Sequence, residues 1–141
     1  MTIQIIQTTQ APDAKPVAVS RNLTTSWLSI VETPSYQVPE ESFGGGTIIV
    51  PGVSEIISPL IVCNKGVATA SFSVRAYRYE LDTEFIIANS IPVAPNDVLT
   101  VPLNGQFFLT GDRLEVQASA NNVLDITISY TVGQAEQDDV V

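Results

Sequence analysis

The chain has 141 residues, of which 45% are hydrophobic and only 15% are charged. Its net charge of −9 argues against binding to nucleic acid or to an anionic membrane, because both partners require clustered lysine and arginine. Cys63 is the only cysteine and histidine is absent, so the chain has no residues for an internal disulfide or a zinc cluster, and we expect no cofactor.

The composition also bears on size and partners. An average soluble domain has about a quarter of its residues charged, so part of the apolar surface of this chain is expected to be covered by another protein. A length of 141 residues suits one domain with a single core. The first residues lack the basic and long apolar regions of a secretory signal, so we expect synthesis in the cytoplasm.

Residues 1–16 are expected to form an extended arm. Ile3, Ile5 and Ile6 make a small apolar patch among polar residues and two prolines, a composition that cannot pack well on itself. Two interpretations remain open. The arm is mobile, or it adds a strand to a neighbouring subunit, with Ile3 and Ile5 facing the same way.

Two short strands are expected next, the first containing Val17 and Val19 and the second containing Trp27. Residues 32–46 include two prolines and three consecutive glycines, which predicts a flexible surface loop. No Lys-Ser/Thr pair and no helical pattern follow the glycines, so we interpret them as a hinge before a strand at 47–50 and not as a phosphate-binding loop.

A central hairpin is predicted in the middle of the chain. Residues 54–63 make a long apolar strand, and residues 67–79 alternate well enough to pair with it across a turn at Asn64.

The outward face of the second strand would then present Arg75, Tyr77 and Tyr79 together. Three carboxylates follow at alternate positions, a spacing that superficially resembles a divalent-metal or glycosidase pair. Because no partner on a second strand can be named, we interpret them as a solvated strand edge. They are Glu80, Asp82 and Glu84.

The rest of the chain is predicted to be strands joined by tight turns. Gly111 permits a positive φ, and Asp112 can bond back to the turn backbone, so we expect Asp112 to be structural and not catalytic. Residues 133–141 are expected to be an acidic tail. The expected strands are 85–88, 97–103, 106–110, 113–118 and 123–131.

Short strands interrupted by turns at near-regular spacing predict an all-β fold, an antiparallel β-sandwich or jelly roll with an extended N-terminal arm. Its domain would span residues 17–132. An enzyme is disfavoured, because the chain has no histidine and no nucleophile elbow, and spacing does not pair its carboxylates.

Several segments between residues 47 and 132 resemble small virion structural proteins of tailed bacteriophages. In that family a strand ending in a Cys-Asn-like turn precedes a strand of small residues, a Pro-x-x-Pro-Asn-Asp-like loop and an L-x-x-G-D turn. The segments here are Ile61-Val62-Cys63-Asn64, residues 71–76, Ile91-Pro92-Val93-Ala94-Pro95-Asn96-Asp97, residues 108–116 and residues 123–130.

The resemblance implies a virion protein, made in the host cytoplasm, that forms a homo-oligomer, often a trimer. It would bind the major capsid protein or other virion proteins as a capsid decoration or cement protein, or serve as a tail, baseplate or fibre module. The positions carried over as turn residues are Asn64, Asn96, Asp97, Gly111 and Asp112. The residues expected to contact partners are Ile3, Ile5, Ile6, Val17, Val19, Trp27, Tyr36 and Phe43, with Trp27 alternatively placed in the core.

If the protein is instead a fibre or baseplate module that contacts host-surface glycans, it needs exposed aromatic and polar side chains in one shallow patch. Arg75, Tyr77 and Tyr79 are the candidates for that alternative.

Overall fold

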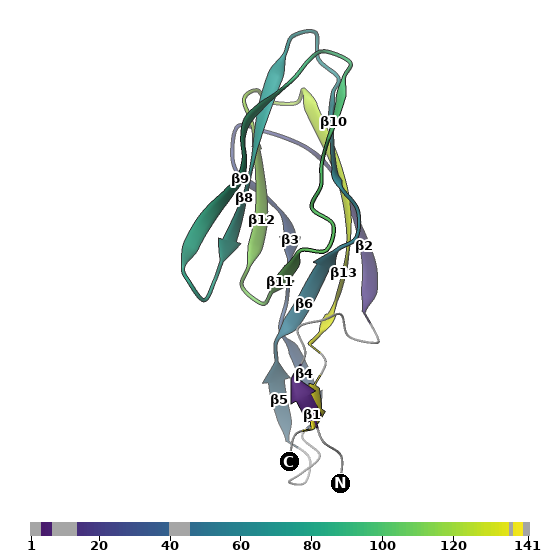
Figure 1. Cartoon of the computed structure of the whole chain (residues 1–141), viewed down its shortest axis with the longest axis vertical. Helices are drawn as coiled ribbons and strands as arrows, with labels where there is room; N and C mark the ends of the chain where they lie inside the picture. The colour runs from purple at the N-terminus through teal and green to yellow at the C-terminus, as the bar shows by residue number, and fades with distance from the viewer. Residues whose placement is uncertain (1–3, 7–13, 40–45, 136, 140–141) are drawn as a thin grey trace.

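The computed structural model describes residues 4–6, 14–39, 46–135 and 137–139 (Figure 1). All regular secondary structure in these ranges is β-strand, and every strand pair is antiparallel. The predicted all-β antiparallel fold is therefore confirmed.

The first large sheet is built around strand β13 (Leu124–Gln134). One edge of β13 pairs with β2 (Lys15–Asn22), and its other edge pairs first with β7 (Leu60–Asn64) and then with β6 (Gly52–Ile56). Beyond β7 and β6 on this side lie β10 (Val98–Val101), paired with β7, and β11 (Phe107–Leu109), paired with β6, while β2 forms the opposite edge of the sheet.

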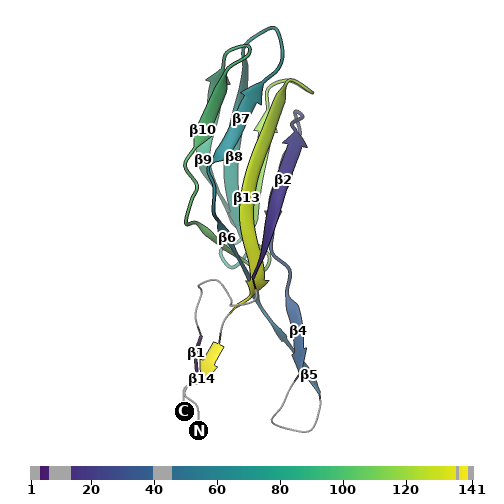
Figure 2. The same ribbon diagram turned by 90° about the vertical axis from the view of Figure 1, so that its right-hand side faces the viewer.

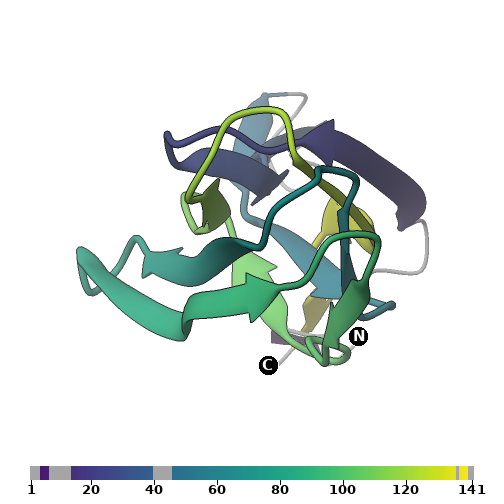
Figure 3. The same cartoon turned by 90° about the horizontal axis from the view of Figure 1, so that it is seen from above.

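The second large sheet contains four strands in the order β3, β12, β8 and β9. Their bounds are β3 (Leu28–Glu32), β12 (Arg113–Ala118), β8 (Ala70–Arg78) and β9 (Thr83–Val93). The hairpin of β8 and β9 extends past the other strands on one side of the molecule (Figure 3). β9 and β11 are each the last strand of their sheet, so both have a free edge among the described residues.

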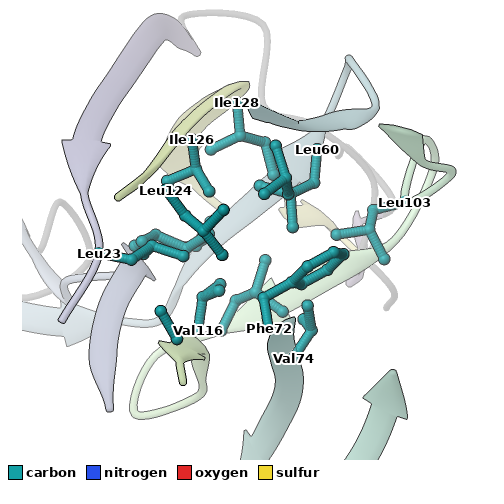
Figure 4. Close-up of a cluster of buried hydrophobic side chains, with 14 of the residues drawn as sticks. Leu23, Leu60, Phe72, Val74, Leu103, Val116, Leu124, Ile126 and Ile128 are labelled. Carbon is teal, nitrogen blue, oxygen red and sulfur yellow. The ribbon is translucent and has the colours of Figure 1, made fainter. Parts of the chain in front are cut away.

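The two sheets face each other across one hydrophobic core (Figures 2 and 4). Phe72 and Val116 enter it from the second sheet, while Leu60 and Ile126 enter it from the first, and all four are almost fully buried. On β8 every second side chain from Ala70 to Ala76 is buried, because successive residues of a strand point to opposite faces. The predicted alternation of this strand is confirmed.

The predicted central hairpin is wrong, because β7 and β8 belong to different sheets. The reason is Asn64, whose fully buried side chain donates to the carbonyl oxygens of Ala68 and Val93 and accepts the N–H of Gly66. These bonds hold a turn that carries the chain across the core instead of back along the same sheet. Asn96, with φ at 61°, donates its N–H to the Asn64 carbonyl and stands in the neighbouring turn.

The strand expected at 54–63 is interrupted. β6 and β7 follow one another along the same edge of β13, separated by Ile57, Ser58 and Pro59. Proline cannot donate to a ladder, and here the Ser58 hydroxyl replaces a backbone acceptor for the N–H of Ser129. The register along β13 shifts by two residues across the break, from Tyr130 opposite Ile56 to Thr127 opposite Ile61, so the alternation of faces is kept.

Two small sheets project from one end of the molecule (Figures 1 and 2). β4 (Tyr36–Pro39) pairs with β5 (Thr47–Val50), so the surface loop predicted for residues 32–46 is wrong in its first part. β1 (Gln4–Ile6) pairs with β14 (Gln137–Asp139), which brings part of the expected arm against part of the expected tail of the same chain. No helix that could span a membrane occurs in the described ranges.

Candidate functional site

An open pocket of about 590 Å³ lies between the end of β8, the β8–β9 turn and β11. We call it the edge pocket. Most of its walls are apolar. It is lined by Pro51, Tyr79, Leu81, Phe107 and Leu109, and by the polar residues Arg78, Glu80, Thr110 and Asp112.

Asp112 connects the segments that line the edge pocket. One carboxylate oxygen accepts the backbone N–H of Tyr79 at 2.9 Å, and the other accepts the N–H of Leu109 at 2.9 Å and the guanidinium of Arg78 at 3.2 Å. Gly111, with φ at 91°, allows the tight turn that brings the carboxylate back to Leu109. Asp112 is buried and its acceptor capacity is largely used within the chain, which is the environment of a structural carboxylate.

Arg78 is held equally firmly. Its guanidinium carbon lies 4.4 Å from the centroid of the Phe108 ring, and Nη1 donates to the carbonyl oxygen of Phe107 at 2.7 Å. The ion pair with Asp112 neutralises the charge of Arg78 in the lining of the pocket. Glu80 is an exposed carboxylate at the rim, and no ion pair to it is found in the described part of the chain.

A second cluster covers the outer face of the second sheet, and we call it the outer cluster. Arg75 stacks on Trp27, with its guanidinium carbon 4.0 Å from the ring centroid. The same guanidinium donates to Glu115 at 2.9 Å and to Glu84 at 3.0 Å. Trp27 is therefore half-buried against an arginine on the outside of the sheet and is not a member of the core.

The outer cluster continues at Tyr77. Arg113 lies over the Tyr77 ring at 4.2 Å, and the Tyr77 hydroxyl donates to Asp82 at 2.7 Å. This hydrogen bond to a carboxylate raises the pKa of Tyr77 above its ordinary value. The polar atoms of Arg75 and Tyr77 thus have intrachain partners, which leaves little capacity to recognise sugar hydroxyl groups.

The expected patch of Arg75, Tyr77 and Tyr79 is divided between two surfaces. Arg75 and Tyr77 belong to the outer cluster, whereas Tyr79 lines the edge pocket and packs closely against Gly111. Strand β8 ends at Arg78, so the alternation that was to place Tyr79 beside Tyr77 stops one residue too early.

The three carboxylates do not share a strand face, and that expectation is wrong. Glu80 and Asp82 lie in the β8–β9 turn, Asp82 has φ at 46°, and Glu84 lies in β9. Asp82 and Glu84 face different partners, Tyr77 and Arg75 respectively. Over the described ranges, no group of three potential ligands could hold a metal ion.

The residues expected to contact partners are scattered. Val17 and Val19 are half-buried and pack against the chain's own core, because β2 is a strand of the first sheet. Tyr36 lies half-buried on the projecting β4. Ile5 and Ile6 lie on β1, whereas Ile3 and Phe43 fall outside the described residues.

The sequence interpretation missed the exposed apolar residues of β5 and of the β8–β9 hairpin. Ile49 is 70% exposed and Leu81 is 65% exposed, with Ile48, Phe85 and Ile86 also exposed. The signal was consecutive apolar residues, since two neighbours in a strand cannot both face the same core. Such exposed apolar positions are typical of surfaces that bind another protein.

No protein-family model matches the chain, and no curated protein matches it.

Proposed function

We propose that this protein is a structural component of a tailed-phage virion, a capsid decoration or cement protein that binds the major capsid protein and stabilises the shell. The proposal starts from the resemblance of residues 47–132 to small virion proteins of such phages. The observation that carries it is the projecting β4–β5 hairpin with its exposed isoleucines.

An isolated two-stranded hairpin is marginally stable in water, so a projecting one gains from packing against a partner. Ile48 and Ile49 point to opposite faces of β5, and both are exposed. Neither β4 nor β5 contains a charged residue. The hairpin can therefore be buried against a capsomer without removing a charge from water.

The fold supports a virion role as well, and we propose that its finer class is a jelly roll. β2, β13, β6 with β7, and β10 with β11 lie side by side in one sheet, facing the four strands of the other. The chain changes sheets between β2 and β3, between β3 and β6 by way of β4 and β5, and between β7 and β8. It changes sheets again between β9 and β10, between β11 and β12, and between β12 and β13. This exchange corresponds to the two Greek keys of a jelly roll, an architecture common in viral capsid and lectin domains.

The expected N-terminal arm fits the same end of the molecule. β1 and β14 project from the same end of the molecule as the β4–β5 hairpin (Figure 2). Capsid shells repeat the same site many times, and an oligomer that engages several sites at once gains avidity from weak individual contacts. A homo-oligomer is therefore part of the proposal.

The experiment adds purified protein to phage particles that lack it and measures the bound copies. We expect Ile49→Ser to lower occupancy strongly. Val67→Ser is the matched control, since Val67 is 99% exposed in the turn after β7, at the opposite end from β5. Equal occupancy of the two variants would contradict a capsid-binding role for the hairpin.

Cryo-electron reconstruction of the same particles then locates the protein. Density over capsomer seams is expected. Density on the tail, baseplate or fibres would replace the decoration role with the second candidate, a module that contacts other tail proteins or host-surface glycans. The observation in favour of that candidate is the outer cluster, in which Arg75 and Arg113 lie over the rings of Trp27 and Tyr77 on the outer face of the second sheet. Because arginines cover both rings, this surface favours contact with other tail proteins over contact with glycans.

A further inference from the structure

The edge pocket is large enough to hold one large side chain of a partner, and most of its walls are apolar. Its volume of about 590 Å³ falls within the range of about 300–1,000 Å³ that is usual for ligand sites. Phe107 and Leu109 line it from β11, and Tyr79 and Leu81 line it from the β8–β9 turn. Burial of an apolar group between these walls would remove apolar surface from water on both sides of the contact.

The pocket is formed before any ligand arrives. Asp112 ties the end of β8 to the turn that follows β11 through its bonds to Tyr79 and Leu109. Arg78 adds a bond to the Phe107 carbonyl, so the two lining segments are joined. A site whose walls are fixed in this way loses little conformational entropy on binding.

Three of the polar groups that line the pocket are engaged within the chain, which disfavours a sugar as the occupant. Recognition of a sugar requires unpaired donors and acceptors, but Asp112 already accepts three hydrogen bonds and Arg78 is engaged with Asp112 and Phe107. The Thr110 hydroxyl donates to the Pro34 carbonyl and accepts the N–H of Gly52. An apolar side chain can bind in the pocket without a hydrogen bond to any of these groups.

The carboxylate of Glu80 at the rim favours a positively charged residue next to the apolar side chain of the ligand. Glu80 is exposed beside the opening, and the described residues supply no cation that pairs with it. The chain as a whole carries a net charge of −9, which adds to the attraction for a positive group. The complement of this rim is a lysine or arginine.

From these observations we propose that the edge pocket binds a segment of a partner protein that presents one large apolar side chain next to a lysine or arginine. The apolar group would lie between Leu81 and Leu109, with the cation beside Glu80. The location of the protein on a particle does not enter this argument, so the pocket can be tested apart from the proposed function.

The test is a titration of the full chain, labelled with ¹⁵N, with blocked tetrapeptides, followed by amide chemical shifts. The first peptide contains phenylalanine followed by lysine. The second replaces the lysine by glutamate, and the third replaces the phenylalanine by serine. We expect the first peptide to shift the amides of Tyr79, Leu81, Phe107 and Leu109, and the other two to bind more weakly.

Two variants examine the two halves of the proposal. Glu80→Gln should weaken binding of the lysine peptide by about two- to fivefold, the effect of one exposed ion pair. It should not weaken binding of the glutamate peptide. Leu81→Ser should weaken both phenylalanine peptides and is expected to fold, because Leu81 is 65% exposed. Val67→Ser, at the other end of the molecule, should bind like the unaltered chain.

The proposal is overturned if the phenylalanine peptides shift none of the pocket amides, or if the lysine and glutamate peptides bind equally well to the unaltered chain. It is also overturned if galactose or N-acetylglucosamine shifts the pocket amides while the peptides do not. If the same amides shift when the protein is diluted without peptide, the chain self-associates through the pocket. That result would assign the pocket to a second copy of this chain instead.

Discussion

The carboxylate of Asp112 accepts the backbone N–H of Tyr79, a residue 33 positions earlier in the chain, at 2.9 Å. The same side chain accepts the N–H of Leu109 and pairs with Arg78. One buried residue thereby joins the ends of three strands, β8, β11 and β12, and holds the edge pocket in shape.

We expect Asp112→Ala to lower the free energy of unfolding by about 2–4 kcal/mol, because it leaves several buried donors without an acceptor. Urea denaturation followed by far-UV circular dichroism measures this. Asp97→Ala is the matched control. Asp97 is exposed and, among the described residues, its carboxylate accepts just the N–H of Val98, so its loss should cost less than about 1 kcal/mol. Equal losses for the two variants would show that the Asp112 contacts are not needed for stability.

Local patterns were sufficient to predict which residues form strands in much of the chain. The strands predicted at 47–50 and 113–118 have the observed bounds, and the buried face of β8 follows its alternation. Pairing was harder to predict. The turn at Asn64 was expected, but whether a turn reverses the chain within a sheet or carries it to the other sheet depends on contacts with residues as distant as Val93.

The edge pocket could not be predicted for the same reason. Its walls come from Pro51, from residues 78–81 and from residues 107–112, which no local motif connects. Sequence reasoning identified Asp112 as a turn residue, and its turn contact with Leu109 is local. Its contact with Tyr79 depends on the packing of the two sheets, which the alternation of single strands does not determine.

Asn64 offers a second test of stability. Its amide nitrogen donates to the carbonyl oxygens of Ala68 and Val93 at 2.9 Å each, and its oxygen accepts the N–H of Gly66 at 2.8 Å. We expect Asn64→Ala to cost about 2–4 kcal/mol, measured by thermal and urea unfolding.

Asn104→Ala is the control for this site, because Asn104 is exposed and makes only a long hydrogen bond of 3.5 Å to Ile57. It should change stability by less than about 0.5 kcal/mol. If Asn64→Ala lowered stability as little as Asn104→Ala does, the turn between β7 and β8 would not depend on the buried amide of Asn64.

Gly52 is expected to tolerate no side chain. A Cβ at this position would collide with the carbonyl oxygen of Pro34 and come within 3.0 Å of the side chains of Tyr36 and Thr33. Gly52→Ala should therefore destabilise the start of β6 by about 1–3 kcal/mol, the usual cost of overpacking. Gly46→Ala, where a Cβ would meet nothing within 4 Å, is the control in the same unfolding assay. Similar melting temperatures for both variants would contradict the close approach at Gly52.

Asp125 connects stability to pH. The hydrogen bond from Asn22 and, less strongly, the nearby Lys65 hold the pKa of its carboxyl below the ordinary value of 3.8. A carboxyl whose pKa is lower in the folded state binds its proton more readily in the unfolded state. Its contribution to stability is therefore complete above the ordinary value and is lost as the pH falls through the folded pKa. Because the side chain is 45% exposed, the contribution is small.

We expect the unaltered chain to be more stable than Asp125→Asn above about pH 5, and the gap to narrow steadily as the pH falls below about 4. Urea unfolding at a series of pH values from neutral to acidic measures the gap. Asn22→Ala removes the main cause of the lowered pKa, so it should narrow the gap at neutral pH and flatten its pH dependence. A gap that stayed constant from neutral pH to pH 3 would mean that the Asn22 contact does not favour the ionised carboxylate.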